Sequence, residues 1–127
     1  MLELLHQVPL FAWLPEEAPE ILNGCFDLET EKLEAGETRR TDGRAGCLLS
    51  GSAVFRPEGT ASDTLSAGSL FAILRDGQGF KHPRSGILTA ASDCAVAWFD
   101  VSLTSNVCYR ACWFHVRLLR EIDRLLG

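Results

Sequence analysis

The chain has 127 residues, a net charge of -5 and 46% hydrophobic residues. These values fit one globular domain rather than two, and no apolar run approaches the roughly 20 residues that a membrane span needs. The N-terminal Met-Leu-Glu-Leu-Leu-His carries an acid where a secretory signal carries bases. We therefore expect a cytoplasmic domain with no membrane partner.

The charge is distributed unevenly along the chain. Residues 1–37 carry a net charge of -8, residues 38–105 a net charge of +1 and residues 106–127 a net charge of +2. None of these segments forms a long basic stripe, which a nucleic-acid-binding surface requires. We therefore do not expect this chain by itself to bind nucleic acid.

Two short helices are predicted at the N-terminal end. The first covers residues 2–8 and ends before Pro9, because proline disfavours helical backbone in the residue before it. The second begins at Pro15, where two acids follow near the positive end of the helix dipole. It ends at Asn23-Gly24, a pair typical of a helix stop.

Residues 26–100 have the pattern of a β-barrel. Short apolar runs alternate with turn residues such as Ser50-Gly51 and Asp76-Gly77, and their spacing of roughly 8–12 residues is typical of antiparallel sandwiches and barrels. The last predicted strand has apolar residues on both faces, which predicts that it is covered on both sides. The predicted strands are Asp27–Glu34, Gly46–Leu49, Ala53–Arg56, Thr64–Ser66, Leu70–Ala72, Gly86–Ala90 and Ala95–Phe99.

Residues 106–126 are predicted to form a long C-terminal helix. From Cys108 to Leu126 the sequence contains neither proline nor glycine. The apolar positions recur at spacings of 3 and 4, which is typical of a helix stripe and of a coiled-coil seam: Ala111, Phe114, Leu118, Ile122 and Leu125. Such a stripe can pack on the barrel of its own chain or on a second copy. The surplus of apolar surface favours a homodimer through this helix.

Several short motifs follow one another in an informative order. Val8-Pro9-Leu10-Phe11 comes first, then Ala35-Gly36-Glu37 and then Leu48-Leu49-Ser50-Gly51-Ser52-Ala53-Val54. Leu65-Ser66-Ala67-Gly68-Ser69-Leu70-Phe71 and Pro83-Arg84-Ser85-Gly86 come after them. In this order they resemble the opening, the "kGE" turn, the "vLSGsv" strand–turn, and the phosphate-cassette entry and exit of the cyclic-nucleotide-binding domain in Crp–Fnr-type bacterial regulators.

The resemblance implies a mainly β fold with flanking helices: a double-stranded β-helix, or jelly roll, with a long C-terminal dimerisation helix. Residues 1–127 then form one effector domain, with N-terminal helices in 1–25, the barrel in 26–100 and the dimerisation helix in 106–126. The family's helix-turn-helix part would lie in a domain that this chain does not contain, so DNA would be reached only through that domain. We predict the effector-sensing and dimerisation domain of a Crp–Fnr-type transcription regulator, and not an enzyme.

The resemblance also assigns the ligand-binding positions, which are Gly68, Phe71, Ala72, Ile73, Arg84 and Ser85. In the family an arginine and backbone N–H groups hold the phosphate, and Arg84 and Ser85 match those contacts. The family's "FGE", whose glutamate binds the ribose hydroxyl, reads Phe71-Ala72-Ile73 here. Losing that charged hydrogen bond costs about 1.5–3 kcal/mol, or roughly 10–150-fold in affinity, and Ala72 crowds a backbone that must approach the ligand.

The residues leave the effector unidentified. They favour a small anion over tight binding of cyclic AMP or cyclic GMP. A pocket filled by Phe71 and Ile73, in a ligand-free dimerisation scaffold, is the alternative.

A stripe of Cys108, Cys112 and His115 lies on one face of the predicted C-terminal helix, at i, i+4 and i+7. Thiolate and imidazole bind zinc and iron, which makes a metal or redox sensor of the same family an alternative. The stripe supplies three ligands where a closed site needs four, and cysteine also packs well as a small apolar residue. We therefore assign no metal site. The five cysteines, odd in number and without a C-x-x-C pair, are expected to be reduced.

A cupin-type enzyme is the remaining alternative with a similar barrel. Cupin metals are held by several histidines on strands. The chain has three histidines, and none lies on a predicted strand.

Overall fold

The computed structural model describes residues 2–16, 28–59, 61–101 and 113–126. In chain order the elements are α1 (Leu2–Leu5), β1 (Glu29–Leu33), β2 (Thr38–Arg40), β3 (Arg44–Ser50), β4 (Ala53–Pro57), β5 (Asp63–Leu65), β6 (Leu70–Phe71), β7 (Ile73–Arg75), β8 (Lys81–Pro83), β9 (Gly86–Ala90), β10 (Cys94–Asp100) and α3 (Trp113–Leu126).

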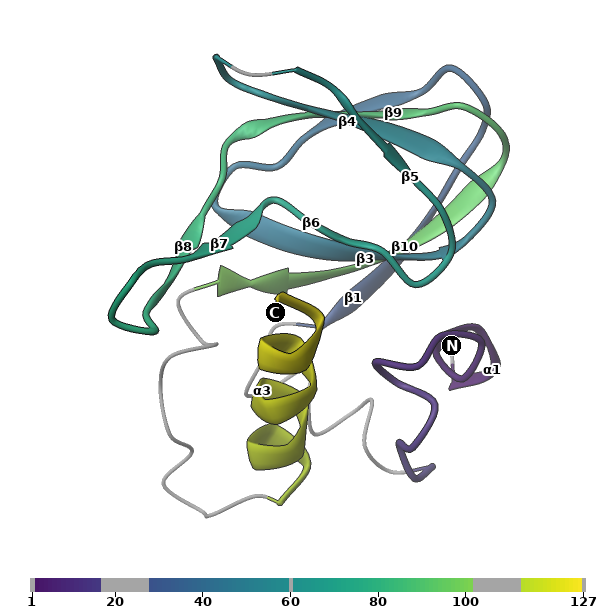
Figure 1. The fold of residues 1–127 in the computed structure, drawn as a ribbon. Helices are drawn as coiled ribbons and strands as arrows, with labels where there is room; N and C mark the ends of the chain where they lie inside the picture. Colours follow the sequence, from purple (N-terminus) through teal and green to yellow (C-terminus); the bar gives the residue numbers. More distant parts are fainter. Residues whose placement is uncertain (1, 17–27, 60, 102–112, 127) are drawn as a thin grey trace.

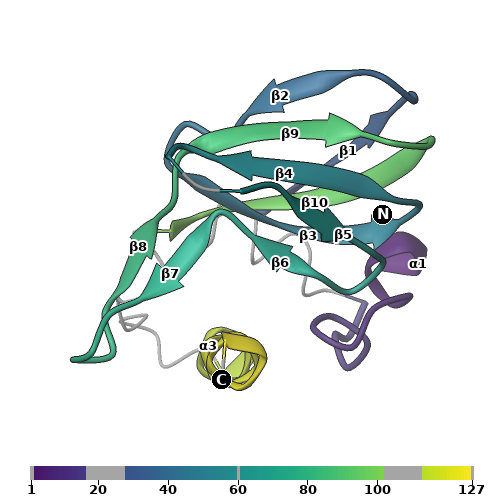
Figure 2. The same cartoon turned by 45° about the horizontal axis from the view of Figure 1, so that its top comes forward.

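Two four-stranded antiparallel sheets face each other and form the barrel (Figure 1). One sheet has the order β1-β10-β3-β6 and the other has the order β2-β9-β4-β5. This two-sheet arrangement is that of a jelly roll, as predicted. Strands β7 and β8 form a separate hairpin that extends from one end of the barrel, and α3 lies outside the sheet that contains β3 and β10 (Figure 2).

All of the predicted strands overlap an observed strand, but the structure adds strands that the sequence pattern did not reveal. Strand β2 was missed because its Thr-Arg-Arg sequence is polar and partly exposed at the edge of a sheet. Strand β8, Lys-His-Pro, lacks an apolar run. The predicted strand over residues 70–72 ends early, because Ala72 has a φ of 66° and turns the chain from β6 into β7.

Helix α1 is shorter than predicted, and the other two predicted helices lie partly outside the described residues. Helix α1 ends at Leu5, and only the first residues of the second predicted helix belong to the described part of the chain. Helix α3 covers 14 residues, and positions 106–112 of the predicted helix lie outside the described residues. Among the described helices, none is long and apolar enough to cross a membrane.

Strand β10 separates two apolar cores, because successive side chains of a strand point to opposite faces. Val96 and Trp98 belong to the core inside the barrel, whereas Ala97 and Phe99 belong to a core on the outer face of the same sheet. The prediction that this strand is covered on both sides is therefore confirmed. The outer core is completed by apolar residues of the N-terminal segment and of α3, which are Leu5, Val8, Leu10, Phe11, Leu14, Leu118 and Ile122.

Two residues of the apolar stripe of α3 pack on their own domain, whereas the preference for a homodimer stays a prediction. Leu118 and Ile122 are both 0% exposed and lie in the outer core. Burying them against the sheet already removes their surface from water, so they do not offer a seam to another chain. Val116 and Leu125 remain 43% and 46% exposed.

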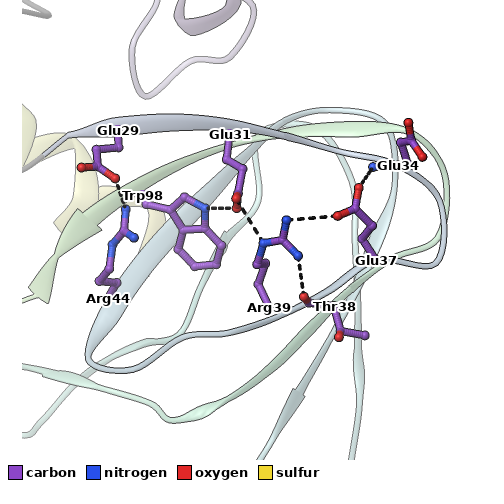
Figure 3. Close-up of polar contacts among 8 residues, drawn as sticks. All are labelled: Glu29, Glu31, Glu34, Glu37, Thr38, Arg39, Arg44 and Trp98. Carbon is purple, nitrogen blue, oxygen red and sulfur yellow. Dashed lines mark hydrogen bonds and ion pairs between the residues drawn. The ribbon is translucent and has the colours of Figure 1, made fainter.

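Polar side chains connect the two sheets where β1 and β2 are both edge strands (Figure 3). Arg39 Nε lies 3.1 Å from Glu31 Oε2, and Arg39 Nη2 lies 3.0 Å from Glu37 Oε2. The indole N–H of Trp98 donates to Glu31 Oε1 over 3.2 Å. Hydrogen bonds from the backbone N–H of Glu34 and from Arg39 lower the pKa of Glu37. These contacts link β1 and β2 where no backbone ladder joins them.

Candidate functional site

The candidate site is built around the corner between β6 and β7. Ala72 forms this corner with a φ of 66°, a left-handed backbone that costs a residue other than glycine about 1–2 kcal/mol. Its carbonyl oxygen accepts a hydrogen bond from the backbone N–H of Arg84 over 2.9 Å. This bond joins the entry and the exit of the predicted cassette, which are separated by the β7–β8 hairpin.

Arg84 and Ser85 connect β8 to β9 at this end of the barrel. Arg84 Nη1 is 3.8 Å from Asp63 Oδ2, and the arginine side chain is 31% exposed. The carbonyl oxygen of Ser85 accepts a hydrogen bond from the backbone N–H of Glu58 over 3.1 Å. The 3.8 Å ion pair between Arg84 and Asp63 is longer than a direct hydrogen bond. A small anion that meets the guanidinium here competes with the carboxylate of Asp63, which is 57% exposed.

Phe71 and Ile73 lie on either side of the corner and belong to different cores. The ring of Phe71 is inside the barrel, 5.6 Å from the ring of Phe55 and 5.4 Å from that of Trp98. Ile73 is 6% exposed and lies in the outer core that Leu118 and Ile122 of α3 also join. Ile73, at the position where the resemblance implies a glutamate, therefore belongs to the apolar core on the helix side of the sheet.

Gly68 lies apart from this corner, in the turn before β6. Its φ is 96°, and its N–H donates to the carbonyl oxygen of Leu48 over 2.7 Å. A Cβ at this position would lie 3.7 Å from Cδ of Pro9. Gly68 therefore shapes the turn next to the N-terminal segment and is not brought to Arg84.

A surface hollow of about 580 Å³ lies beside the corner and includes Ser85. Its other lining residues come from the ends of β2, β4 and β9 and from the loops that follow β2 and β4. Arg40 and Arg56 both face Ile87 in the strand register, so the two arginines flank one exposed isoleucine. The sequence pattern did not single out Arg40 or Arg56, because only strand pairing brings residues so distant in the chain into one row.

The side chain of Asp76 makes its hydrogen bonds within the tip of the β7–β8 hairpin. Asp76 Oδ1 accepts hydrogen bonds from the backbone N–H groups of Gln78 and Phe80, at 2.9 and 3.0 Å. Asp76 Oδ2 lies 2.8 Å from Nε2 of His82, and this contact, together with the two backbone bonds, lowers the pKa of Asp76. His82 belongs to β8, although the sequence placed no histidine on a strand, and it is exposed.

The predicted Cys/His stripe cannot be located in this structure. Cys108 and Cys112 lie outside the described residues, as does the side chain of His115. Within the part of the chain that the structure describes, no three His, Cys, Asp or Glu side chains are grouped as a metal ion would need. Cys47 is buried, and its burial raises the pKa of the thiol to about 12, which keeps it protonated at neutral pH.

Comparison with known proteins gives matches at the level of structure. No protein-family model matches the chain, and no curated protein does. A protein of Geobacter metallireducens GS-15, assigned by name to the cyclic-nucleotide-binding proteins, superposes with a TM-score of 0.61 at 14% identity, over 98% of this chain and 93% of that chain. The N-terminal domain of a transcriptional regulator from Streptomyces coelicolor A3(2) superposes with a TM-score of 0.54 at 20% identity, over 97% and 90%.

A third neighbour extends the range of proteins that share this fold. It is the cyclic-nucleotide-binding homology domain of a KCNH channel, with a TM-score of 0.61 and 19% identity, over 97% of this chain and 93% of that chain. The superpositions establish a common fold, and at these low identities the ligand has to be argued from the residues of the site.

Proposed function

We propose that this chain, which has the fold of the cyclic-nucleotide-binding domains, is the effector-sensing domain of a bacterial transcription regulator similar to the Crp–Fnr proteins. Its effector is a small anion that binds at Arg84 and Ser85. The observation that carries the proposal is the bond between the N–H of Arg84 and the carbonyl of Ala72, at 2.9 Å. It fixes the backbone of the arginine at the base of the hairpin, where the side chain is partly exposed near Asp63.

A tight site for cyclic AMP or cyclic GMP is not part of this proposal. The ribose hydroxyl needs a polar partner, and Ile73 offers none. Ile73 also contributes to the core beneath α3 rather than to a polar pocket. A ribose placed at this corner would lose water without gaining a hydrogen bond at that position, which is unfavourable.

Isothermal titration calorimetry of the full chain tests the anion site. Inorganic phosphate, cyclic AMP and cyclic GMP are titrated into the wild type, into Arg84→Ala and into Arg120→Ala, which removes an exposed arginine of α3 as a control. We expect phosphate to bind the wild type and the control alike, and Arg84→Ala to bind it roughly 10–150-fold more weakly, because a charged hydrogen bond is lost. We expect the cyclic nucleotides to bind no more tightly than phosphate.

Two results would overturn the proposal. Phosphate affinity that is unchanged in Arg84→Ala would remove this arginine from the site. Micromolar binding of either cyclic nucleotide would show that another group replaces the missing glutamate.

A homodimer, with DNA contacted through another domain, completes the proposed regulator. Because Leu118 and Ile122 pack on their own barrel, the helix surface left for a second copy includes Val116 and Leu125, which are both partly exposed. Sedimentation velocity over a range of concentrations tests this part. A dimer that Val116→Glu converts to a monomer would support contact through α3, whereas a monomer at every concentration would exclude it.

A further inference from the structure

The β7–β8 hairpin is fastened to α3 by one carboxylate. Arg75 Nη1 lies 3.2 Å from Asp123 Oδ1, and Lys81 Nζ lies 3.0 Å from the same oxygen atom. Arg75 Nη1 also donates to the backbone carbonyl oxygen of Asp123 over 3.2 Å. Figures 1 and 2 show the hairpin beside the C-terminal part of α3, so residues more than 40 positions apart form one contact.

The hairpin needs this carboxylate because of its own strand register. Arg75 and Lys81 are direct cross-strand partners, and like charges in that position destabilise a pair of strands. A two-stranded hairpin is marginally stable by itself. Asp123 places a negative charge against both cations, which converts a repulsive pair into an attractive group of three.

The burial of Lys81 shows how closely the helix covers the hairpin. Its side chain is only 7% exposed, while that of Asp123 is 43% exposed. Lysine is almost never buried to this extent unless it is paired. Without the negative charge of Asp123, the ammonium group of Lys81 would be buried with no carboxylate to compensate its charge. A displacement of the hairpin that returned this group to water would then lower the free energy.

Helix α3 benefits from the same contact. The carbonyl of Asp123 belongs to the last turn of the helix, where carbonyl groups lack partners within the helix and the helix dipole is negative. The guanidinium of Arg75 satisfies that carbonyl and places a positive charge at this end of the helix. Each element therefore stabilises the other.

We propose that Arg75, Lys81 and Asp123 form an ionic latch, so that the hairpin and the last turns of α3 are ordered together and are released together. Such coupling is reciprocal: whatever displaces the hairpin also loosens the helix, and the reverse. The latch lies between the anion corner and α3, because Arg84 follows directly after β8. The idea that the latch transmits effector binding to α3 rests on the proposed function. The coupling of the hairpin to α3 does not.

Hydrogen–deuterium exchange of the full chain, followed by mass spectrometry, tests the latch. Asp123→Asn is compared with the wild type and with Glu121→Gln, which removes the charge of a carboxylate paired with Arg124 in the same helix. In Asp123→Asn we expect amides of residues 73–83 and of α3 to exchange faster by a similar factor, about 5- to 150-fold, the usual size of a coupling between two elements. Amides of β3 and β10, in the centre of the barrel sheet, serve as the internal reference and should not change.

A second variant separates the latch from a simple loss of stability. Lys81→Met keeps the apolar stem of the side chain but removes the charge that faces Arg75. We expect Lys81→Met to restore much of the hairpin protection when it is added to Asp123→Asn, because the repulsion then has no source. Glu121→Gln should leave the hairpin unchanged.

Three results would overturn the latch. These are faster exchange in α3 alone, faster exchange in the hairpin alone, or no recovery in the double variant. The phosphate titration of Arg84→Ala is independent of each of them, so a failed latch and a failed anion site can be told apart.

Discussion

The backbone N–H of Arg84 donates a hydrogen bond to the carbonyl oxygen of Ala72 over 2.9 Å, and this bond closes the base of the β7–β8 hairpin. The two residues are brought together because Ala72 turns the chain out of the barrel and Pro83 brings it back opposite Ile73. The corner therefore fixes both the arginine proposed to meet the effector and the hairpin that reaches α3.

Replacing Ile73 by glutamate should destabilise the domain and should not create a cyclic-nucleotide site. The side chain is buried in the outer core beside Leu118 and Ile122, where an unpaired carboxylate costs about 3–5 kcal/mol. Urea denaturation measures the loss. Ile87→Glu is the matched control, because Ile87 is 45% exposed and its replacement should change stability by about 0.5 kcal/mol or less. A fully stable Ile73→Glu that binds cyclic AMP would contradict this account.

Substitutions of Ala72 test the energetic cost of its left-handed backbone conformation. Ala72→Gly relieves strain of about 1–2 kcal/mol but loses a buried methyl group worth about 0.8 kcal/mol and about 0.5–1 kcal/mol of unfolded-chain entropy. We therefore expect its unfolding free energy to stay close to that of the wild type. Ala72→Val should be strongly destabilising, because a β-branched residue rarely adopts a positive φ.

Ala53→Val is the control for the side-chain volume that Ala72→Val adds to the core. Ala53 lies in the same core but on strand β4, and it is equally buried. Thermal melts of the two valine variants should show the larger loss at position 72. Equal losses would mean that crowding, and not backbone strain, sets the cost there.

Replacing Gly46 by alanine should disturb the aromatic core of the barrel. A Cβ on Gly46 would lie 2.7 Å from Cε1 of Phe71 and closer still to its Cζ, so the ring, which packs against Trp98, would have to shift. Overpacking of this kind costs about 1–3 kcal/mol. Gly77→Ala is the control, because a Cβ there meets nothing within 4 Å. Guanidinium denaturation that gives equal midpoints for both variants would contradict the packing.

Acid should weaken the contacts that link β1 and β2. The folded protein lowers the pKa of Glu37 through the N–H of Glu34 and through Arg39, so the unfolded state binds its proton first as the pH falls. The stabilisation is complete above the ordinary glutamate pKa of about 4.3 and is lost as the pH falls through the lowered value in the folded state. The midpoint of urea denaturation should therefore fall in that range.

Glu37→Gln provides the control for this pH dependence. The variant keeps an acceptor for the N–H of Glu34 but cannot titrate, so its stability should depend less steeply on pH below about 4.3. The indole N–H resonance of Trp98, which donates to Glu31 in the same network, reports the local change. An identical pH dependence in both proteins would exclude Glu37 as a contributor.

The sequence by itself determined the barrel and the order of its parts. The continuous apolar run of β10 and the turn residues around Gly51 act locally, so the sequence pattern alone predicts strands and turns. The motif order also indicated that Ala72, Arg84 and Ser85 belong together. It could not reveal strand β2, because Arg39 and Arg40 look like loop residues until a partner strand accepts them.

Tertiary structure alone decided which surfaces these elements meet. Leu118 and Ile122 have the same spacing whether they face their own sheet or a second copy. Only the tertiary structure shows that they pack on the sheet. Ile73 follows Phe71 by two residues and would share its face on a regular strand, but the turn at Ala72 sends it to the other core. The meeting of Lys81 with Asp123 has no local pattern, because an ion pair depends on distance in space and not on separation along the chain.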